Sequence, residues 1–268
     1  MTTLYHSDYT PRTEGSLHQW SNEKDNCGMG AIALLNNEKS YQVLDLALQS
    51  VCNMTHRGAV DADGKTGDGS GILCQIPRPL FAKALTEMGS KVDVARLAVG
   101  VFFFPSQDTA GQKQIQKSAE SIVAKRGMTV VGWREVPVNQ DELGKIAQKT
   151  RPEIQHFLID RPEAWDEETY ERQLFLCRRE LELQFKDVQG FYMPSFSGRL
   201  ISYKGLAMPA ALRAFYGDLQ DSDFQIGISL YHQRFSTNTF PAWPLGQPFR
   251  MMCHNLSLIH ISEPTRPY

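Results

Sequence analysis

The junction Asp25-Asn26-Cys27-Gly28-Met29-Gly30 constrains this chain more than any other stretch. Before it lies a polar leader, and after it begins the short apolar run 31–35, which is typical of a buried strand. We interpret the junction as a processing point where residues 1–26 are removed and Cys27 becomes the N-terminus. A terminal cysteine carries a nucleophilic thiol and a free α-amine that can act as its base. From residue type alone, a buried cysteine that opens a strand is the competing interpretation.

Composition excludes several classes of protein. The chain has 268 residues and a net charge of −2, with no long basic run, so nothing indicates nucleic acid as a partner. No apolar run reaches the roughly 18 residues of a membrane span. The leader lacks an apolar segment and contains acids, which disfavours secretory and mitochondrial targeting and predicts a cytoplasmic protein. Five cysteines without a CxxC pair argue against a disulfide framework and a metal site.

Hydrophobic periodicity predicts strands grouped between helices, so we expect one layered α/β or α+β domain with no internal repeat. A hairpin-like strand pair is expected across Ser197-Gly198. The predicted strands are 28–35, 72–76, 95–104, 128–136, 153–159, 191–195, 199–203, 226–235 and 249–254, and the predicted helices are 41–54, 79–88, 108–126, 141–149 and 166–185.

A glycine-rich and acidic stretch lies between the first helix and the second strand. It contains His56-Arg57-Gly58-Ala59 and Thr66-Gly67-Asp68-Gly69-Ser70-Gly71 and shows neither helical nor strand period. A surface turn is one interpretation, and a loop beside the active site is the other. The stretch lacks the Gly-Lys-Ser/Thr of a phosphate-binding loop. Asp61 and Asp63 could suggest calcium, but the further ligands of an EF-hand loop do not follow.

Two later stretches carry candidate chemistry. His232-Gln233-Arg234-Phe235-Ser236-Thr237-Asn238-Thr239 closes an apolar strand, and an arginine there can hold a carboxylate by two parallel hydrogen bonds, or can simply be a surface residue. In Cys253-His254-Asn255, the asparagine amide can donate to an oxyanion. His254 could pair with a thiol as a base, although a packed or exposed histidine is the simpler interpretation.

Taken in order, these motifs resemble the N-terminal glutaminase domain of the large subunit of glutamate synthase, a class II glutamine amidotransferase. The resemblance runs from about Asp25 to Asn255 and includes Tyr203-Lys204-Gly205. Thr66–Ile72 and Asn238–Leu245 favour glutamate synthase over other class II amidotransferases. The resemblance implies an α+β fold, the four-layer αββα sandwich of the N-terminal nucleophile hydrolases, truncated here at its C-terminus.

The resemblance also implies roles for three residues. Cys27 would be the nucleophile that attacks the glutamine side-chain amide, Arg234 would bind the substrate carboxylate, and Asn255 would bind the oxyanion. The family has a glycine after that asparagine as a second oxyanion donor, where this chain has Leu256. From Leu256 to Tyr268 the resemblance ends, and the run looks like translated sequencing-adapter read-through. We therefore expect a leader at 1–26, an incomplete amidotransferase domain at 27–255 and a non-native tail at 256–268.

The function implied is hydrolysis of glutamine to glutamate and ammonia, with the ammonia passed to 2-oxoglutarate for reductive amination in the intact protein. FMN and an iron–sulfur cluster are implied for that intact protein and none for this fragment. A small electron-donating subunit or ferredoxin is implied as its partner. The fragment itself is expected to have little or no activity. The alternatives are another class II amidotransferase, or a catalytically inactive fragment or binding module.

Overall fold

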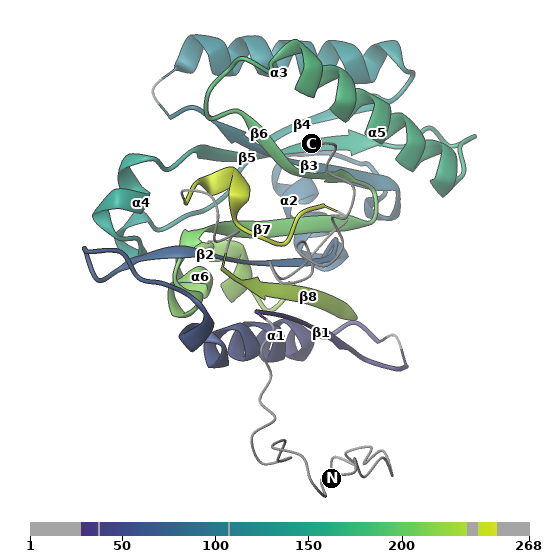
Figure 1. The fold of residues 1–268 in the computed structure, drawn as a ribbon. Coiled ribbons are helices and arrows are strands. Elements are labelled where there is room, and N and C mark those ends of the chain that lie inside the picture. The colour runs from purple at the N-terminus through teal and green to yellow at the C-terminus, as the bar shows by residue number, and fades with distance from the viewer. Residues whose placement is uncertain (1–27, 37, 107, 235–240, 251–268) are drawn as a thin grey trace, which may run out of the picture.

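The computed structural model describes residues 28–36, 38–106, 108–234 and 241–250. Within these ranges the chain forms two four-stranded antiparallel sheets, with helices on the outer side of each (Figure 1). The α+β sandwich expected from the sequence is therefore confirmed.

The first sheet has the strand order β1-β8-β2-β7. Its strands are β1 (Met29–Ala33), β2 (Thr66–Gln75), β7 (Leu200–Ala207) and β8 (Ile228–Gln233). One row of paired residues crosses the whole sheet, because Met29 pairs with His232, His232 with Gly71, and Gly71 with Lys204. Paired residues of antiparallel strands project to the same face, so this row lies on one side of the sheet.

The second sheet has the strand order β4-β5-β3-β6. Its strands are β3 (Leu97–Phe104), β4 (Thr129–Glu135), β5 (Glu153–Asp160) and β6 (Tyr192–Ser197). Every residue of β3 is buried, as its uniformly apolar sequence predicts for a strand covered on both faces.

Helices cover the outer faces of both sheets. Helices α1 (Tyr41–Asn53) and α6 (Pro209–Phe215) lie against the first sheet, and α3 (Thr109–Lys125) and α5 (Glu167–Gln184) against the second (Figure 1). Helices α2 (Arg78–Glu87) and α4 (Lys145–Lys149) complete the set within the described ranges. Three of the longer helices begin at a side-chain cap, Ser40, Asp108 or Asp166, which accepts a hydrogen bond from an otherwise unpaired backbone N–H.

Two apolar cores result from this layering. One joins both sheets to α1, α2 and α6, and the other joins the second sheet to α3 and α5. The predicted helix faces are confirmed, because Leu44, Leu48 and Val51 of α1 and Leu174 and Leu181 of α5 are buried.

The hairpin expected across Ser197-Gly198 is wrong. Strand β6 pairs with β3 in the second sheet, whereas β7 pairs with β2 in the first sheet. The tight turn is real, but the chain passes between sheets there. Local sequence could not distinguish the two cases, because the same turn residues serve both.

Strand β2 begins six residues earlier than the predicted start at Ile72, at Thr66. The stretch 66–71 is therefore a buried part of the central region of the sheet, and the surface-turn interpretation is wrong. Its glycines explain the tight packing, because a Cβ on Gly71 would lie 2.5 Å from Cβ of Lys204 and 2.6 Å from the Gln247 carbonyl oxygen.

Candidate active site

The predicted site residues fall partly within the described ranges. Arg234 is described, whereas Cys27, Asn255 and the neighbouring Cys253 and His254 lie outside the described residues. The positions next to the junction in the chain can still be followed. Gly28, which follows Cys27 in sequence, accepts a backbone hydrogen bond of 2.6 Å from Gln233, which precedes Arg234. The fold thus brings Gly28, the residue after the predicted nucleophile, beside the strand end that leads into Arg234.

Arg234 has an unusual backbone that the first sheet holds in place. Its φ angle is 92°, a left-handed conformation that side chains other than glycine rarely adopt. Its N–H donates a 2.7 Å hydrogen bond to the Gly69 carbonyl, which anchors it to β2. Such strain concentrates at functional sites, where surrounding structure over-determines it. Because the side chain is 40% exposed, its guanidinium can still meet a ligand.

Asp68 lies behind that guanidinium. Its Oδ2 is 3.3 Å from Arg234 Nε, and its side chain is only 4% exposed. Neither carboxylate oxygen has a hydrogen-bond partner among the described residues. Burial raises the pKa of Asp68, and the nearby backbone N–H of Ala59 and then the positive charge of Arg234 oppose that rise without cancelling it. A buried carboxylate in this position orients the arginine by charge, and Nη1 of Arg234 is also 3.5 Å from the Arg57 carbonyl.

The His56–Ala59 motif packs against Asp68 and Gln233. Gly58 ends the single helical turn Thr55–Arg57, and a Cβ there would lie 2.0 Å from Nε2 of Gln233 and 3.1 Å from Oδ1 of Asp68. Gln233 is 2% exposed, and its Oε1 has no hydrogen-bond partner within the described part of the chain. Only glycine therefore allows this turn to approach the amide and the carboxylate so closely.

Asp63 holds the loop in place through hydrogen bonds. Its carboxylate accepts hydrogen bonds from the backbone N–H groups of Lys65, Thr66 and Ile146 and from the Thr66 hydroxyl. The Thr66 hydrogen bonds chiefly hold the pKa of Asp63 well below its usual range. The loop is thereby joined to α4. In the described ranges, no group of three or more His, Cys, Asp or Glu side chains is placed to hold a metal ion.

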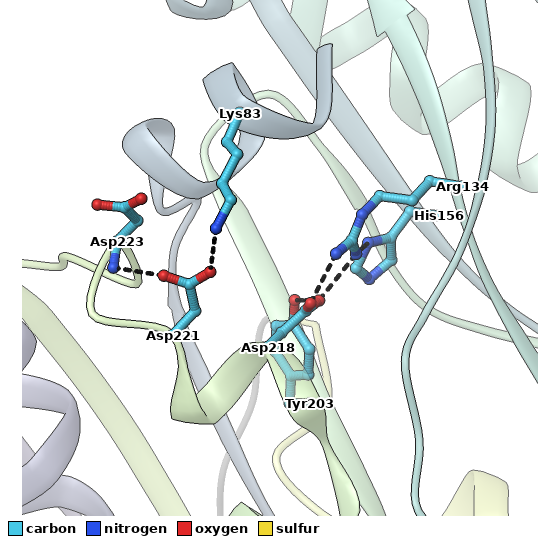
Figure 2. A network of polar contacts seen from close by, with 7 residues as sticks. All are labelled: Lys83, Arg134, His156, Tyr203, Asp218, Asp221 and Asp223. Atoms are coloured by element: carbon cyan, nitrogen blue, oxygen red, sulfur yellow. Dashed lines mark hydrogen bonds and ion pairs between the residues drawn. The ribbon is translucent and has the colours of Figure 1, made fainter. Parts of the chain in front are cut away.

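A second polar cluster lies in the core between the sheets (Figure 2). Asp218 accepts hydrogen bonds of 2.9 and 2.7 Å from Arg134 of β4 and one of 2.8 Å from the Tyr203 hydroxyl. Burial is the largest single influence and raises the pKa of Asp218, but the hydrogen bonds from Arg134 and Tyr203 and the electrostatic influence of His156 and Arg134 together outweigh it and hold that pKa low. Burial lowers the pKa of the adjacent His156 to about 3, so its imidazole is neutral. These partners satisfy one another, and the cluster ties the two sheets together.

The sequence predicted Arg234 as a site residue but gave no indication of the carboxylate beside it. Asp68 stood in a motif that was interpreted as a loop beside the site, and its acidic type was the only available signal. Its contact with Arg234 depends on the pairing of β2 with β8, which brings Ser70 opposite Gln233.

Two antiparallel sheets between layers of helices are the arrangement of an N-terminal nucleophile hydrolase domain. Residues 27–260 match the family described as "Glutamine amidotransferases class-II". The chain belongs to this family, and the recognition made from its motifs is confirmed.

The curated relatives include glutamate synthases. The chain is 38% identical over 245 residues to the large chain of an NADPH glutamate synthase from Azospirillum brasilense, covering 91% of this chain and 16% of that protein. It is 38% identical to ferredoxin-dependent glutamate synthase 2 from Synechocystis, over 87% of this chain and 15% of that protein. It is also 38% identical to the large chain of an NADPH glutamate synthase from Bacillus subtilis, over 91% of this chain and 16% of that protein. The chain thus spans about 16% of the length of such relatives.

Among the helices of the described residues, none combines the length and apolar character needed to cross a bilayer.

Proposed function

We propose that this chain is the glutaminase domain of a glutamate synthase and that it hydrolyses glutamine to glutamate and ammonia. The observation that carries the proposal is the pairing of Gly28 with Gln233 beside Arg234 and its buried partner Asp68. This arrangement sets a cation for the substrate carboxylate next to the position that follows Cys27 in the chain. The family match, which starts at residue 27, supports the same assignment.

In the proposed mechanism, residues 1–26 are removed and Cys27 acts as an N-terminal nucleophile. A terminal amine and a cysteine thiol titrate near ~7.7–8.0 and ~8.5, so proton transfer between them is accessible at neutral pH. The thiol attacks the carboxamide carbon while the amine accepts its proton. Arg234 holds the substrate carboxylate by parallel hydrogen bonds, as its exposed guanidinium allows.

Asn255 then donates to the oxyanion, and such a donor contributes roughly 3–4 kcal/mol to lowering the barrier. Ammonia leaves with a proton returned from the Cys27 amine, and a thioester forms between the sulfur and the glutamyl carbonyl. Water attacks this thioester and releases glutamate and the free thiol. The same amine can serve as the base for that water.

The names of the relatives support a proposal for the whole protein. We propose that the ammonia aminates 2-oxoglutarate in a part of the intact protein outside this chain. FMN and an iron–sulfur cluster would carry electrons for that step, supplied by a small subunit or by ferredoxin. The described cysteines do not fit such a cluster, since Cys52, Cys74 and Cys177 lie on three different elements and in no metal-binding group. We also propose a cytoplasmic location.

We also propose the division of the chain into a leader at 1–26, an incomplete amidotransferase domain at 27–255 and a non-native tail at 256–268. The fragment alone should have weak activity. If residues 256–268 are foreign, the complete gene encodes Asn-Gly at 255–256. Sequencing the gene beyond codon 255 tests this. Robust ammonia release by purified 1–268 would contradict both the foreign tail and the incomplete site.

The experiment that tests the function uses the complete gene product. Intact mass should show loss of residues 1–26, and Cys27→Ala should abolish glutamine-dependent glutamate formation while leaving the fold unchanged. An active enzyme that keeps its leader would refute the N-terminal nucleophile. If Cys27→Ala has no effect, the domain is a binding module. If glutamine is hydrolysed but 2-oxoglutarate is not aminated, another amidotransferase is indicated.

A further inference from the structure

Lys204 on β7 is a completely buried lysine that the proposed mechanism does not use. Its side chain is 0% exposed. Its Nζ donates to the Pro244 carbonyl at 2.9 Å and to the Tyr192 hydroxyl at 3.4 Å. Both acceptors are uncharged, and within the described ranges no carboxylate forms an ion pair with Lys204. A buried ammonium without a carboxylate is costly, so its presence calls for a specific role.

The ammonium bridges two points of one segment. It lies 4.8 Å from the ring centroid of Phe249 and 4.7 Å from that of Tyr192, which is within the range of cation–π attraction. Because Pro244 and Phe249 both belong to the stretch 241–250, one side chain holds that stretch at both of these positions. An apolar side chain of the same size could make the ring contact but not the hydrogen bond.

The neighbouring glycines show how closely this stretch is held. A Cβ on Gly71 would lie 2.6 Å from the Gln247 carbonyl oxygen, and a Cβ on Gly205 would lie 2.4 Å from the ring of Trp243. The stretch thus rests directly on β2 and β7. Lys204 also shares the row of paired residues that contains Met29 and His232, so its side chain leaves the sheet on their face.

We propose that Lys204 is a positioning residue for the glutaminase reaction, because it fixes segment 241–250 on β2 and β7, and the Gly69 carbonyl of β2 anchors the backbone of Arg234. Two groups of the proposed mechanism, the carboxylate-binding cation and the oxyanion donor, flank this segment in sequence. The inference rests on the proposed function. Burial lowers the pKa of Lys204 to about 7, with the charge of Arg178 adding to the effect, which agrees with an ammonium kept at some cost to folding.

The test compares Lys204→Met with Lys113→Met in the complete gene product. Methionine keeps most of the volume and removes the charge, and Lys113 is an exposed lysine of α3 that provides the matched control. We expect Lys204→Met to raise KM for glutamine about tenfold or more and to accelerate hydrogen exchange in 243–250, without faster exchange in β3 and β5. Its melting temperature should change little, because the loss of two hydrogen bonds opposes the gain from removing a buried charge. Lys113→Met should match the wild type in every measurement.

A second variant covers the case in which Lys204→Met does not fold. Phe249→Leu removes the aromatic face and keeps an apolar side chain, so we expect the same rise in KM and the same local increase in exchange, on a smaller scale. Lys204→Arg keeps the charge and should recover part of the glutamine affinity.

Unchanged KM and exchange in both Lys204→Met and Phe249→Leu would overturn the inference. So would a loss of protection spread evenly over both sheets with KM unchanged, since that result would make Lys204 a purely structural residue. If the wild type releases no ammonia from glutamine, the proposed function fails instead. Exchange in 243–250 of the Lys204→Met variant still decides whether Lys204 holds the segment.

Discussion

Asp68→Asn is the most informative single change at the site. Asparagine has nearly the same shape as aspartate but no charge, so the substitution removes the electrostatic partner of Arg234 without creating a cavity. In the structure Oδ2 of Asp68 is 3.3 Å from Arg234 Nε, and the two side chains are 4% and 40% exposed. The question is whether attraction or desolvation dominates this pair.

Coulomb's law gives an attraction of about 5 kcal/mol for charges 3.3 Å apart at an effective dielectric constant of about 20. Burying the carboxylate costs several kcal/mol in the opposite direction. The pKa of Asp68 is raised despite Arg234, so burial is the larger effect. A carboxyl with a raised folded-state pKa stabilises the fold at low pH and loses that contribution as pH rises through the folded-state pKa. Asparagine is neutral at every pH, so at pH 7 Asp68→Asn should leave stability unchanged or increase it.

Although Asp68→Asn should not lower the stability of the fold, it should weaken glutamine binding. Without Asp68, Arg234 loses the charge that orients it, and a charge-assisted contact of this kind contributes about 1.5–3 kcal/mol. At about 1.4 kcal/mol for each factor of ten, kcat/KM should fall about 10- to 150-fold. Most of the change should appear in KM, because the substrate carboxylate is held equally before and during the reaction.

The assay measures glutaminase kinetics and thermal unfolding of the complete gene product at pH 7, with Asp218→Asn as the matched control. Asp218 is 2% exposed and makes two hydrogen bonds to Arg134, so removing its charge leaves a buried cation without its partner. We expect that control to lose about 3–5 kcal/mol of stability with KM unchanged. The reasoning is refuted if Asp68→Asn destabilises the fold as the control does, or if it binds glutamine as well as the wild type.

Three further variants test the surroundings of the site. Gly58→Ala places a Cβ 2.0 Å from Gln233 Nε2, so kcat/KM should fall about tenfold, with about 1–3 kcal/mol of stability lost to overpacking, measured by steady-state kinetics and urea unfolding. Arg234→Gly should be about 1 kcal/mol more stable than Arg234→Ala, because only glycine adopts a φ of 92° freely; equal urea midpoints would show that this backbone is unstrained. Asp63→Ala should speed hydrogen exchange at Ile146 and lower the melting temperature at pH 7. That difference should shrink below about pH 4, because a carboxyl with a lowered pKa loses its contribution as pH falls; a pH-independent difference would contradict the assigned hydrogen bonds.

The helices and most strands could be predicted because their signals are local. The apolar spacing of Leu44, Leu48 and Val51 indicates which face of α1 is buried, and the structure confirms it. Helix α6 was missed, since its seven residues are too few to show a clear period. Segment 66–71 was missed because polar and glycine residues seldom form buried strand, and here the packing of β7 and of residue 247 against it required small side chains.

The sequence by itself determined the family, because ordered motifs around Cys27, Arg57, Arg234 and Asn255 are a matter of residue identity and order. It also determined where most elements begin and end, since capping and periodicity act over a few residues. Only the tertiary structure decided that β6 and β7 belong to different sheets and that Asp68 supports Arg234. Those outcomes depend on which strands pair across long stretches of chain, and no local pattern encodes that choice.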